Sequence, residues 1–504
     1  MNADLARLGG VVGALGLSVL IAAPPRSWRA GGLAGWALGC VLLAISVAPA
    51  GHHRAYAAAA ILGALAACLL ALLFLRLPWT LAAAVLACAP ARIPVSIGST
   101  PAKLLLPLYV VVAGAAVALA CELLVPGRVA MARAGRVFQP RGRHVGEAPV
   151  ALDRGEPEHP ALGPFAWPAA LLIGWSGIAL LWSEGRRDGA IYLLFYLLPL
   201  GLLAVSLARL EWRLVWVKTL YAQLAAMALA FAVIGIEQYL TRNIYWNPKV
   251  KVDNAYAPVG WFYRVNSVFY DPSIYGRFLV VGILASLVLV LFVRGAWAWA
   301  AAGAAAVTVV GLLPSFSQSS YFALAIGIAV GLTVLWRRRA VLPLAVAAAA
   351  LAAVTLGVPQ LRHRVLGKAN LSHATGTRSK LVSTGADVFV HHPVIGVGTG
   401  GFAKAYGKET HTKGRASHDA PITVAAETGL PGIAALLWLL VPALWFPFRR
   451  NRAATSSERA RLAFGLALLA IVVHSLFYNA LIEDPLFWAL LALTAVVLRQ
   501  PDAA

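Results

Sequence analysis

Apolar runs long enough to cross a bilayer recur along almost the whole chain, and they constrain its fold more than any other feature. The 504 residues are 60% hydrophobic and only 12% charged, whereas soluble proteins average about 25% charged residues. A helix needs roughly 17–25 apolar residues to cross the hydrocarbon core. The sequence therefore predicts an all-α, polytopic membrane protein with about fourteen transmembrane helices and one large external loop that carries short helices.

Two polar segments divide the predicted spans into three groups. Residues 1–124, 161–358 and 421–504 are predicted to form membrane helices, 125–160 a cytoplasmic linker and 359–420 the external loop. The predicted spans are 8–23, 31–49, 56–75, 78–90, 104–124, 161–182, 188–208, 215–239, 272–293, 296–313, 317–336, 340–358, 421–446, 462–482 and 484–498. The shortest run, 78–90, is either a span or a re-entrant segment.

The formal charge of +22 has a membrane explanation. Lys and Arg concentrate in short cytoplasmic loops and are attracted to anionic headgroups, so membrane lipids are the expected partners. The chain shows no nucleic-acid-binding motif. Alternating the spans from the basic loop at 337–339 places residues 183–189, 241–271, 314–318 and 359–420 on the outer side.

The long external loop carries the opposite of the expected charge. It contains nine Lys or Arg residues, at 362, 364, 368, 378, 380, 404, 408, 413 and 415, against three acids, at 387, 409 and 419. The positive-inside rule is weak for loops of about 60 residues. Attraction to anionic lipid and a site for a polyanionic ligand both explain this charge, and charge alone leaves the two open.

The first half of this loop predicts a short amphipathic helix over 377–390, ended by Pro393. Arg378 lies in its first turn, where a guanidinium presents rigidly arranged donors suited to a phosphate. Solvation of a helix end is the alternative role. The run GVGTGG at 396–401 lacks the βαβ context of a nucleotide-binding loop, so it predicts a tight turn.

His418 lies where the loop re-enters the membrane, next to Asp419. A neutral imidazole can take a proton from a hydroxyl, and the neighbouring carboxylate could orient or tune it. A structural role is the alternative. The pairs His391–His392 and His52–His53 lack acidic or cysteine partners at metal-ligand spacing. We therefore predict no metal and no other cofactor.

Several segments resemble a known family. His418-Asp419, nine residues, Gly429, two residues and Gly432, within SHDAPITVAAETGLPG, resemble the signature of the O-antigen ligase and O-antigen polymerase superfamily of bacterial envelopes. GTRSKLVSTGADVFVHHPVIGVGTGGF at 376–402, NSVFYDPSIYGRF at 266–278 and SFSQSSYFAL at 315–324 are similar to further family segments. The resemblance is specific over about 260–485 and architectural before that.

The resemblance implies a metal-independent, inverting glycosyltransferase of the multi-span type, in the bacterial inner membrane. Such enzymes move a glycan from an undecaprenyl-diphosphate carrier to a glycan or lipid acceptor on the periplasmic side. By resemblance, Arg378 would bind the diphosphate as it leaves, and His418 would act as base on the acceptor hydroxyl.

Four further residues are expected to contribute to substrate binding. Arg264 and Arg277 are candidate diphosphate contacts, Asp419 would tune His418, and Glu427 could be a second acid or base. Their structural alternatives are a solvated loop residue for Arg264, an interfacial anchor for Arg277 and helix packing for Glu427. Asp419 stands where the family usually has Asn, Ser or Gln. Gln318 stands where many members have Arg.

Two questions stay open from the sequence. A ligase and a polymerase use the same donor chemistry, so the motifs do not separate them. A membrane transporter for a polyanionic or lipid-linked substrate is the rival class. Ion-coupled transporters usually place carboxylates in mid-span, whereas Glu122 and Glu237 lie near the ends of predicted spans, which favours the enzyme.

Overall fold

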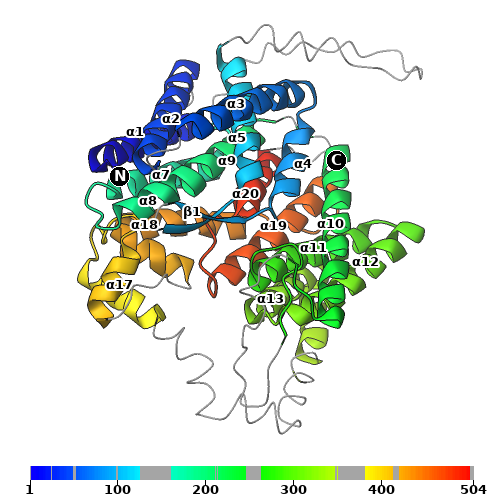
Figure 1. The fold of residues 1–504 in the computed structure, drawn as a ribbon. Helices are drawn as coiled ribbons and strands as arrows, with labels where there is room; N and C mark the ends of the chain where they lie inside the picture. Colours follow the sequence, from blue (N-terminus) through cyan, green and yellow to red (C-terminus); the bar gives the residue numbers. More distant parts are fainter. Residues whose placement is uncertain are drawn as a thin grey trace, which may run out of the picture.

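The structure, a computed structural model, describes residues 2–23, 25–48, 53–97, 100–124, 160–210, 212, 214–245, 263–346, 349, 381–411 and 419–499. Most of these residues are helical, so the all-α prediction is confirmed (Figure 1). The α-helices are α1 (Ala3–Ala22), α2 (Arg26–Val47), α3 (His53–Arg76), α4 (Trp79–Cys88), α5 (Leu106–Leu124), α7 (Ala166–Ala179), α8 (Arg186–Tyr192), α9 (Leu198–Ala208), α10 (Leu214–Thr241), α11 (Pro272–Phe292), α12 (Ala296–Leu312), α13 (Gln318–Trp336), α17 (Phe402–Thr410), α18 (Ala420–Trp445), α19 (Ser456–Ser475) and α20 (Pro485–Arg499).

The number of membrane spans is lower in the described part of the chain than the predicted fourteen. Nine helices there are long and apolar enough to cross a membrane, and three shorter ones are apolar. The run at 78–90 forms only the 10-residue helix α4, and the run at 161–182 forms the 14-residue helix α7. Most of the predicted span 340–358 lies outside the described residues. The count of fourteen is therefore not confirmed.

One hairpin departs from the predicted all-helical architecture. Strands β1 (Ile93–Ile97) and β2 (Thr100–Leu104) pair antiparallel, and Ile93 lies opposite Leu104. The β-branched residues Ile93, Val95 and Ile97 alternate along β1, which is the pattern that favours a strand over a helix. The hairpin fills the connection between α4 and α5.

The first two helices pack through small residues. A Cβ on Gly39 of α2 would lie 2.2 Å from the Cα of Gly13 in α1, and one on Gly16 would lie 2.4 Å from the backbone nitrogen of Trp36. Lipid is as apolar as a leucine side chain, so helices in a membrane associate through such close backbone contacts. The glycines therefore join α1 and α2 into a tight hairpin.

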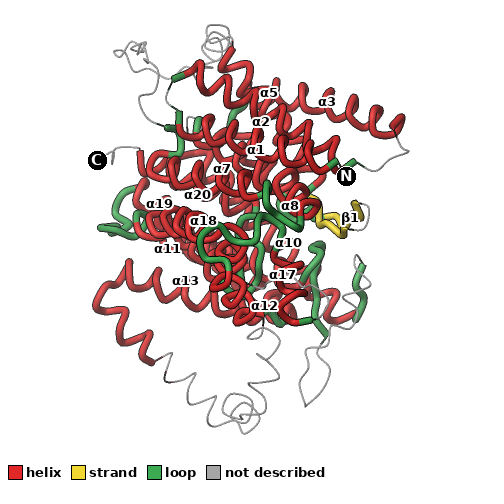
Figure 2. The backbone as a smooth tube through the Cα atoms, turned by 90° about the vertical axis from the view of Figure 1, so that its left-hand side faces the viewer, coloured by secondary structure: helices red, strands yellow, loops and turns green. Residues whose placement is uncertain are grey.

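The interior is built from helices far apart in the sequence. Every residue of α9 is buried, and a π-helical turn at Leu193–Leu197 links it to α8. The C-terminal helix α20 packs on α9, and α19 packs on α11 and α13. In Figure 2, α1, α2, α3 and α5 lie together above, and α11, α12 and α13 lie below. In the same view, α19 and α20 lie between these upper and lower helices.

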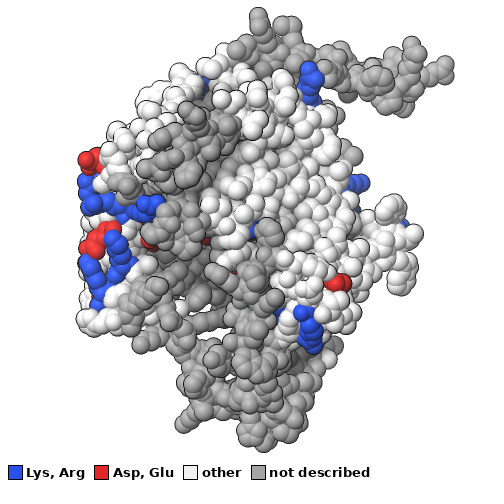
Figure 3. All heavy atoms as spheres, viewed as in Figure 1, with Lys and Arg blue, Asp and Glu red and all other residues white. Residues whose placement is uncertain are grey.

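On the face seen in Figure 3, the charged side chains of the described residues are concentrated at one edge. In Figure 3, Lys, Arg, Asp and Glu gather at the left edge, over α8 and α17, whereas much of the remaining visible surface is uncharged. A broad uncharged surface is the expected exterior of a protein that lies in lipid. The charged edge includes α17, which belongs to the described part of the predicted external loop.

Candidate active site

Helix α18 begins at Asp419 and breaks at Gly429. The Asp419 side chain accepts a hydrogen bond from the Ile422 amide, 2.9 Å away, and so caps the helix. Burial raises the pKa of Asp419, and this cap bond partly opposes the shift. Gly429 has φ 65° and ψ −160°, a conformation that only glycine adopts without strain. The break frees backbone groups that need partners outside the helix.

The glycine turn supplies those partners. The amides of Val397 and Gly398 donate to the carbonyls of Ala426 and Glu427, each over 2.9 Å, and the Leu430 amide donates to Pro393 over 2.8 Å. These bonds join the loop to both sides of the break at Gly429. The predicted tight turn at 396–401 is confirmed, because Gly396, Gly398 and Gly400 all have positive φ.

Glu427 also contacts the glycine turn through its side chain. Its carboxylate accepts from the Phe402 amide, 3.3 Å away, and also from the Gly400 amide. Both donors lie where the glycine turn leads into α17. These contacts agree with the structural alternative given for Glu427, a role in helix packing. A role toward substrate remains a proposal.

A second segment, 175–189, forms hydrogen bonds to the glycine turn and to α18. The Trp175 indole donates to the Thr428 carbonyl over 2.7 Å, and the Trp182 indole donates to the Gly396 carbonyl over 3.3 Å. The Thr399 hydroxyl donates to the Ser176 carbonyl over 2.7 Å. Segments that are more than 200 residues apart therefore meet around the break in α18.

A short helix at 381–391 follows Arg378 in the sequence. Its buried residues Leu381 and Val388 form a small core with Phe402 and Tyr406 of α17 and with Ala426 of α18. The described part of the predicted amphipathic helix 377–390 is thus confirmed. Arg378, His418 and the neighbouring 351–380 and 412–418 lie outside the described residues.

Arg277 lies buried in an ion pair rather than at an interface. Its guanidinium lies 2.8 Å from the Asp484 carboxylate and donates to the Ala480 carbonyl over 3.2 Å. Beside it, buried Arg92 donates to the Glu483 carbonyl over 2.7 Å, and its guanidinium lies 3.8 Å from the Glu483 carboxylate. Arg277 is therefore not an interfacial anchor, the structural alternative given above, but part of a buried cluster of charged residues.

The residues Arg92, Glu483 and Asp484 were not predicted as part of the site. A signal for the acidic pair exists, because two adjacent acids precede the apolar run of α20, and buried acids among membrane helices usually have partners. Nothing in the sequence indicates which arginine each acid contacts. Arg92 and Glu483 are 391 residues apart.

The connection 476–484 links this cluster to the beginning of α18. The Asn479 amide donates to the Thr423 hydroxyl over 3.1 Å, and that hydroxyl in turn donates to the Asp419 carbonyl over 2.7 Å. Phe477 packs edge-on against Phe322 of α13, with ring centroids 5.6 Å apart. One short segment therefore contacts both Arg277, through Ala480 and Asp484, and the first turn of α18, through Asn479.

Arg264 lies at the corner between α12 and α13. Its Nε donates to the Ser315 carbonyl over 2.9 Å, and the next amide, of Val265, donates to Pro314 over 3.0 Å. Gln238 fixes the same segment through two hydrogen bonds to the Ser267 backbone. Arg264 is therefore held in place by its neighbours and is only partly exposed. Gln318 is exposed at the start of α13.

The paired histidines form no metal cluster in the described part of the chain. The His391 Nδ1 lies 2.9 Å from a Glu409 carboxylate oxygen. No group of three or more His, Cys, Asp or Glu residues that could hold a metal ion occurs among the described residues. His52 lies outside the described residues.

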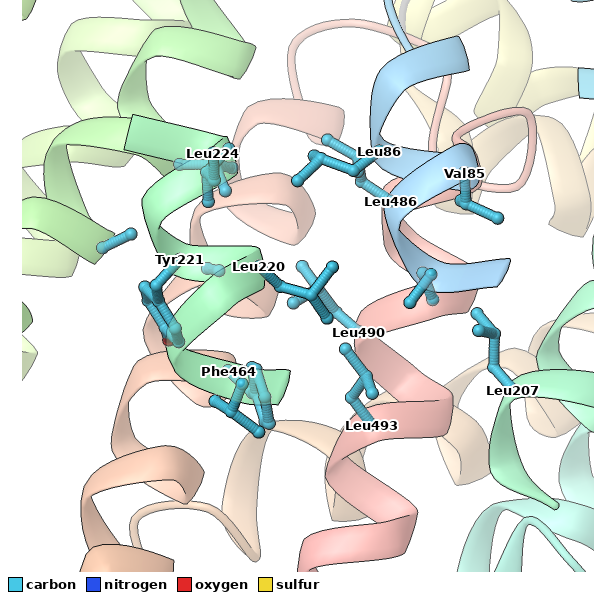
Figure 4. Close-up of a pocket in the computed structure, with 16 residues that line it drawn as sticks. Val85, Leu86, Leu207, Leu220, Tyr221, Leu224, Phe464, Leu486, Leu490 and Leu493 are labelled. Carbon is cyan, nitrogen blue, oxygen red and sulfur yellow. The ribbon is translucent and has the colours of Figure 1, made fainter. Parts of the chain in front are cut away.

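The cavity shown in Figure 4 is apolar and presents almost no polar groups to a ligand. It lies between α4, α10, α19 and α20 and is lined almost wholly by aliphatic and aromatic side chains, such as Leu220, Phe464 and Leu490. An apolar cavity within a membrane bundle suits hydrocarbon. The polar candidates lie elsewhere, around α18.

Comparison with known proteins identifies the region around this site. Residues 303–437 match the family described as O-antigen ligase. This stretch runs from α12 through the polar loop into α18, and it contains both Arg378 and His418. No curated protein matches the chain. The match supports membership of the O-antigen ligase superfamily, and it does so over this stretch of the chain.

Proposed function

We propose that this protein transfers a glycan from an undecaprenyl-diphosphate carrier to an acceptor hydroxyl on the outer face of the bacterial inner membrane. Membership of the family indicates glycan transfer in general. The single observation that carries the proposal is the family match over 303–437, because it covers the entire predicted external loop. The match lends no support to the transporter alternative.

The proposed step is a displacement at the anomeric carbon of the donor sugar. The acceptor oxygen forms a bond to that carbon while the bond to the diphosphate oxygen breaks, which inverts the configuration. His418 takes the proton of the attacking hydroxyl. Arg378 offsets the negative charge that grows on the leaving diphosphate, a role that a guanidinium fits well. No metal takes part.

Four described residues have proposed supporting roles. Arg264, oriented by Ser315, is a second diphosphate contact, and Arg277, whose charge is paired with Asp484, is a weaker candidate contact. Asp419 starts α18 and stands next to His418 in the chain, so its carboxylate favours the protonated imidazole. Glu427 fixes the glycine turn against α18 and thereby orients the segment that follows Arg378.

The contacts between distant segments support a common side for the site. Residues 183–189 and 359–420 are both predicted to lie outside, and Lys408 contacts Glu184 over 2.7 Å. Residues 241–271 and 314–318 are also predicted outside, and Arg264 contacts Ser315. We propose that this side is the periplasmic one.

The test is a transfer assay with purified protein and an undecaprenyl-diphosphate glycan. Arg378→Ala and His418→Ala should each lower the rate by at least about a hundredfold, the usual size of a lost acid–base or charge contribution. Lys380→Ala and His411→Ala are matched controls from the same loop and should transfer normally. Normal transfer by either of the first two variants would remove its assigned role.

Two further readouts complete this assay. EDTA should leave the rate unchanged, and strong inhibition that added divalent metal reverses would contradict the metal-independent mechanism. The product distinguishes the two family activities. A lengthened carrier-linked chain identifies a polymerase, and a glycan on a separate acceptor identifies a ligase.

A further inference from the structure

A second cavity lies beside the glycine turn. It has a volume of about 350 Å³ and lies between the helix at 381–391, α17 and the loop that follows α7. Small-molecule sites usually begin at about 300 Å³ and combine an apolar wall with a few polar groups. Nothing in the family match assigns a role to this cavity, and the proposed transfer step does not use it.

The wall of the cavity is mixed in character. Trp182 lines it with Val388 and Ile395, and the polar side chains are those of Glu184, His392, Lys408 and Glu409. An indole offers a flat apolar surface for the C–H face of a sugar ring. Carboxylates accept hydrogen bonds from hydroxyls, whereas an ammonium donates to them. This combination fits a polyhydroxylated ligand.

The polar groups are held by one another and by the turn. Lys408 contacts the Glu184 carboxylate over 2.7 Å, and Lys404, one helical turn earlier, donates to the Glu184 carbonyl over 2.7 Å. The hydrogen bond from Lys408 holds the pKa of Glu184 below its usual value, so that carboxylate is ionised. Trp182 is fixed through its bond to Gly396. Groups that are held in place lose little entropy on binding.

The pairing of charges argues against a phosphate in this cavity. The ammonium that lines the cavity, of Lys408, is paired with the Glu184 carboxylate, and the Glu409 carboxylate contacts His391. A phosphate would have to replace Glu184 as the partner of Lys408, whereas the hydroxyls of a neutral saccharide can hydrogen-bond to these groups without breaking the pairs. The cavity therefore differs in chemistry from the expected diphosphate contacts at Arg378 and Arg264.

The position of the cavity relates it to the reaction. Its helical wall begins three residues after Arg378, and α17 ends eight residues before His418. We infer that this cavity, lined by Trp182, Glu184, His392, Lys408 and Glu409, binds a neutral sugar unit of a glycan substrate. The inference rests on the proposed function, since it takes its ligand class from glycan transfer.

The test measures binding without transfer. Purified full-length protein in detergent is titrated calorimetrically with free neutral di- to tetrasaccharides and with glycan released by mild acid from the host's carrier lipid. Trp182→Ala should weaken binding roughly tenfold, as expected for loss of an aromatic contact surface. Glu409→Gln, at an exposed position that leaves the fold intact, should weaken binding about threefold.

Matched controls and competitors make the result decisive. Trp297→Ala and Lys218→Ala, at exposed positions far from the cavity in sequence, should bind like the wild type. His418→Ala should also bind normally, because binding needs no base. The inference would be overturned if the wild type bound no saccharide, or if Trp182→Ala and Glu409→Gln both bound saccharide with wild-type affinity. Displacement of the saccharide by inorganic pyrophosphate would also overturn it.

The two proposals can fail separately. If His418→Ala transfers glycan normally while Trp182→Ala loses saccharide affinity, the proposed mechanism fails and the cavity assignment stands. If the wild type transfers glycan but the cavity variants retain full saccharide affinity, the cavity assignment fails and the proposed function stands.

Discussion

Arg277 and Asp484 show how a single residue pair links separate parts of the molecule. Each is nearly fully buried, with about 4% and 5% of the side chain exposed. A buried charge without a partner is costly, whereas a matched pair roughly offsets its own desolvation. The pair therefore fixes the beginning of α20 against α11, whatever further role Arg277 has toward substrate.

Removing one member of this pair should destabilise the protein. Arg277→Leu or Asp484→Leu should lower the free energy of unfolding by about 3–5 kcal/mol, because the remaining charge stays buried. The double variant should recover most of that loss. Thermal unfolding of the purified protein in detergent measures both effects.

The double variant also separates structure from function. If Arg277 only stabilises the fold, Arg277→Leu/Asp484→Leu will recover transfer together with stability. If Arg277 contributes to diphosphate binding, stability will return while the rate stays low. A double variant as unstable as either single one would contradict the pair's assigned energetics.

Asp419 combines a cap with a charge, and substitution can separate them. Asp419→Ala should cost about 1 kcal/mol through loss of the cap to Ile422, whereas Asp419→Asn keeps that hydrogen bond. Because burial raises the pKa of Asp419, folding loses stability as the pH rises from the unfolded pKa through the folded one. Asn removes this cost, so Asp419→Asn should be at least as stable as the wild type at neutral pH.

The same substitution should move the pH profile of transfer. A negative charge next to His418 favours the imidazolium and raises its pKa. Asp419→Asn should therefore shift the acid limb of the rate profile to lower pH, since the base is then neutral at lower pH. An unchanged profile would leave Asp419 only its role as a helix cap.

At the scale of elements, the break in α18 and the glycine turn form one unit. The turn donates to Ala426 and Glu427, and Gly396 approaches α18 so closely that a Cβ there would lie 2.4 Å from the Glu427 carbonyl carbon. No side chain fits that gap. The family-like glycines therefore serve close approach of two backbones, and this holds α17 against α18.

Paired glycine substitutions test this close approach. Gly396 and Gly163 both have positive φ, but a Cβ on Gly163 would meet no atom within 4 Å. Gly163→Ala should cost roughly 1–2 kcal/mol, the strain of the left-handed conformation alone. Gly396→Ala should cost clearly more and abolish transfer, because the turn must move away from α18. Equal unfolding temperatures for the two variants would rule out this explanation.

At the scale of the whole molecule, the proposed function depends most on which segments lie on the same side of the membrane. The segments predicted to lie outside contact one another in two pairs, around Glu184 with Lys408 and around Arg264 with Ser315. At the end of α20, Arg499 donates to the Ala208 carbonyl over 2.6 Å. A common outer face would place acceptor, carrier headgroup and loop together.

Accessibility of single cysteines checks the proposed sides. In a variant without the four native cysteines, Glu184→Cys and Lys408→Cys should react with a membrane-impermeant maleimide on intact spheroplasts. The basic segments 213–218 and 449–461 are predicted to lie inside by the same charge rule, so Lys218→Cys and Arg452→Cys should react only after the membrane is opened. Labelling of the second pair on intact spheroplasts would reverse the proposed orientation.

The sequence by itself determined the class of protein and indicated the region proposed to carry its chemistry. Apolar runs dictate helices in a membrane, since only satisfied backbones tolerate hydrocarbon, and the family-like motifs around Arg378 and His418 depend on local spacing. The hairpin at β1 and β2 was not predicted, and the count of about fourteen spans is not confirmed in the described part of the chain. Short apolar segments do not by themselves distinguish a span from a packed half-helix.

Only the tertiary structure decided which distant groups meet. Arg92 contacts Glu483, which is 391 residues away in the sequence, and Lys408 contacts Glu184, which is 224 residues away. No periodicity in the sequence encodes such pairings, because they depend on how helices pack and which backbones come close enough to touch. The same packing makes the cavity beside Trp182, whose walls come from segments that carry no shared motif.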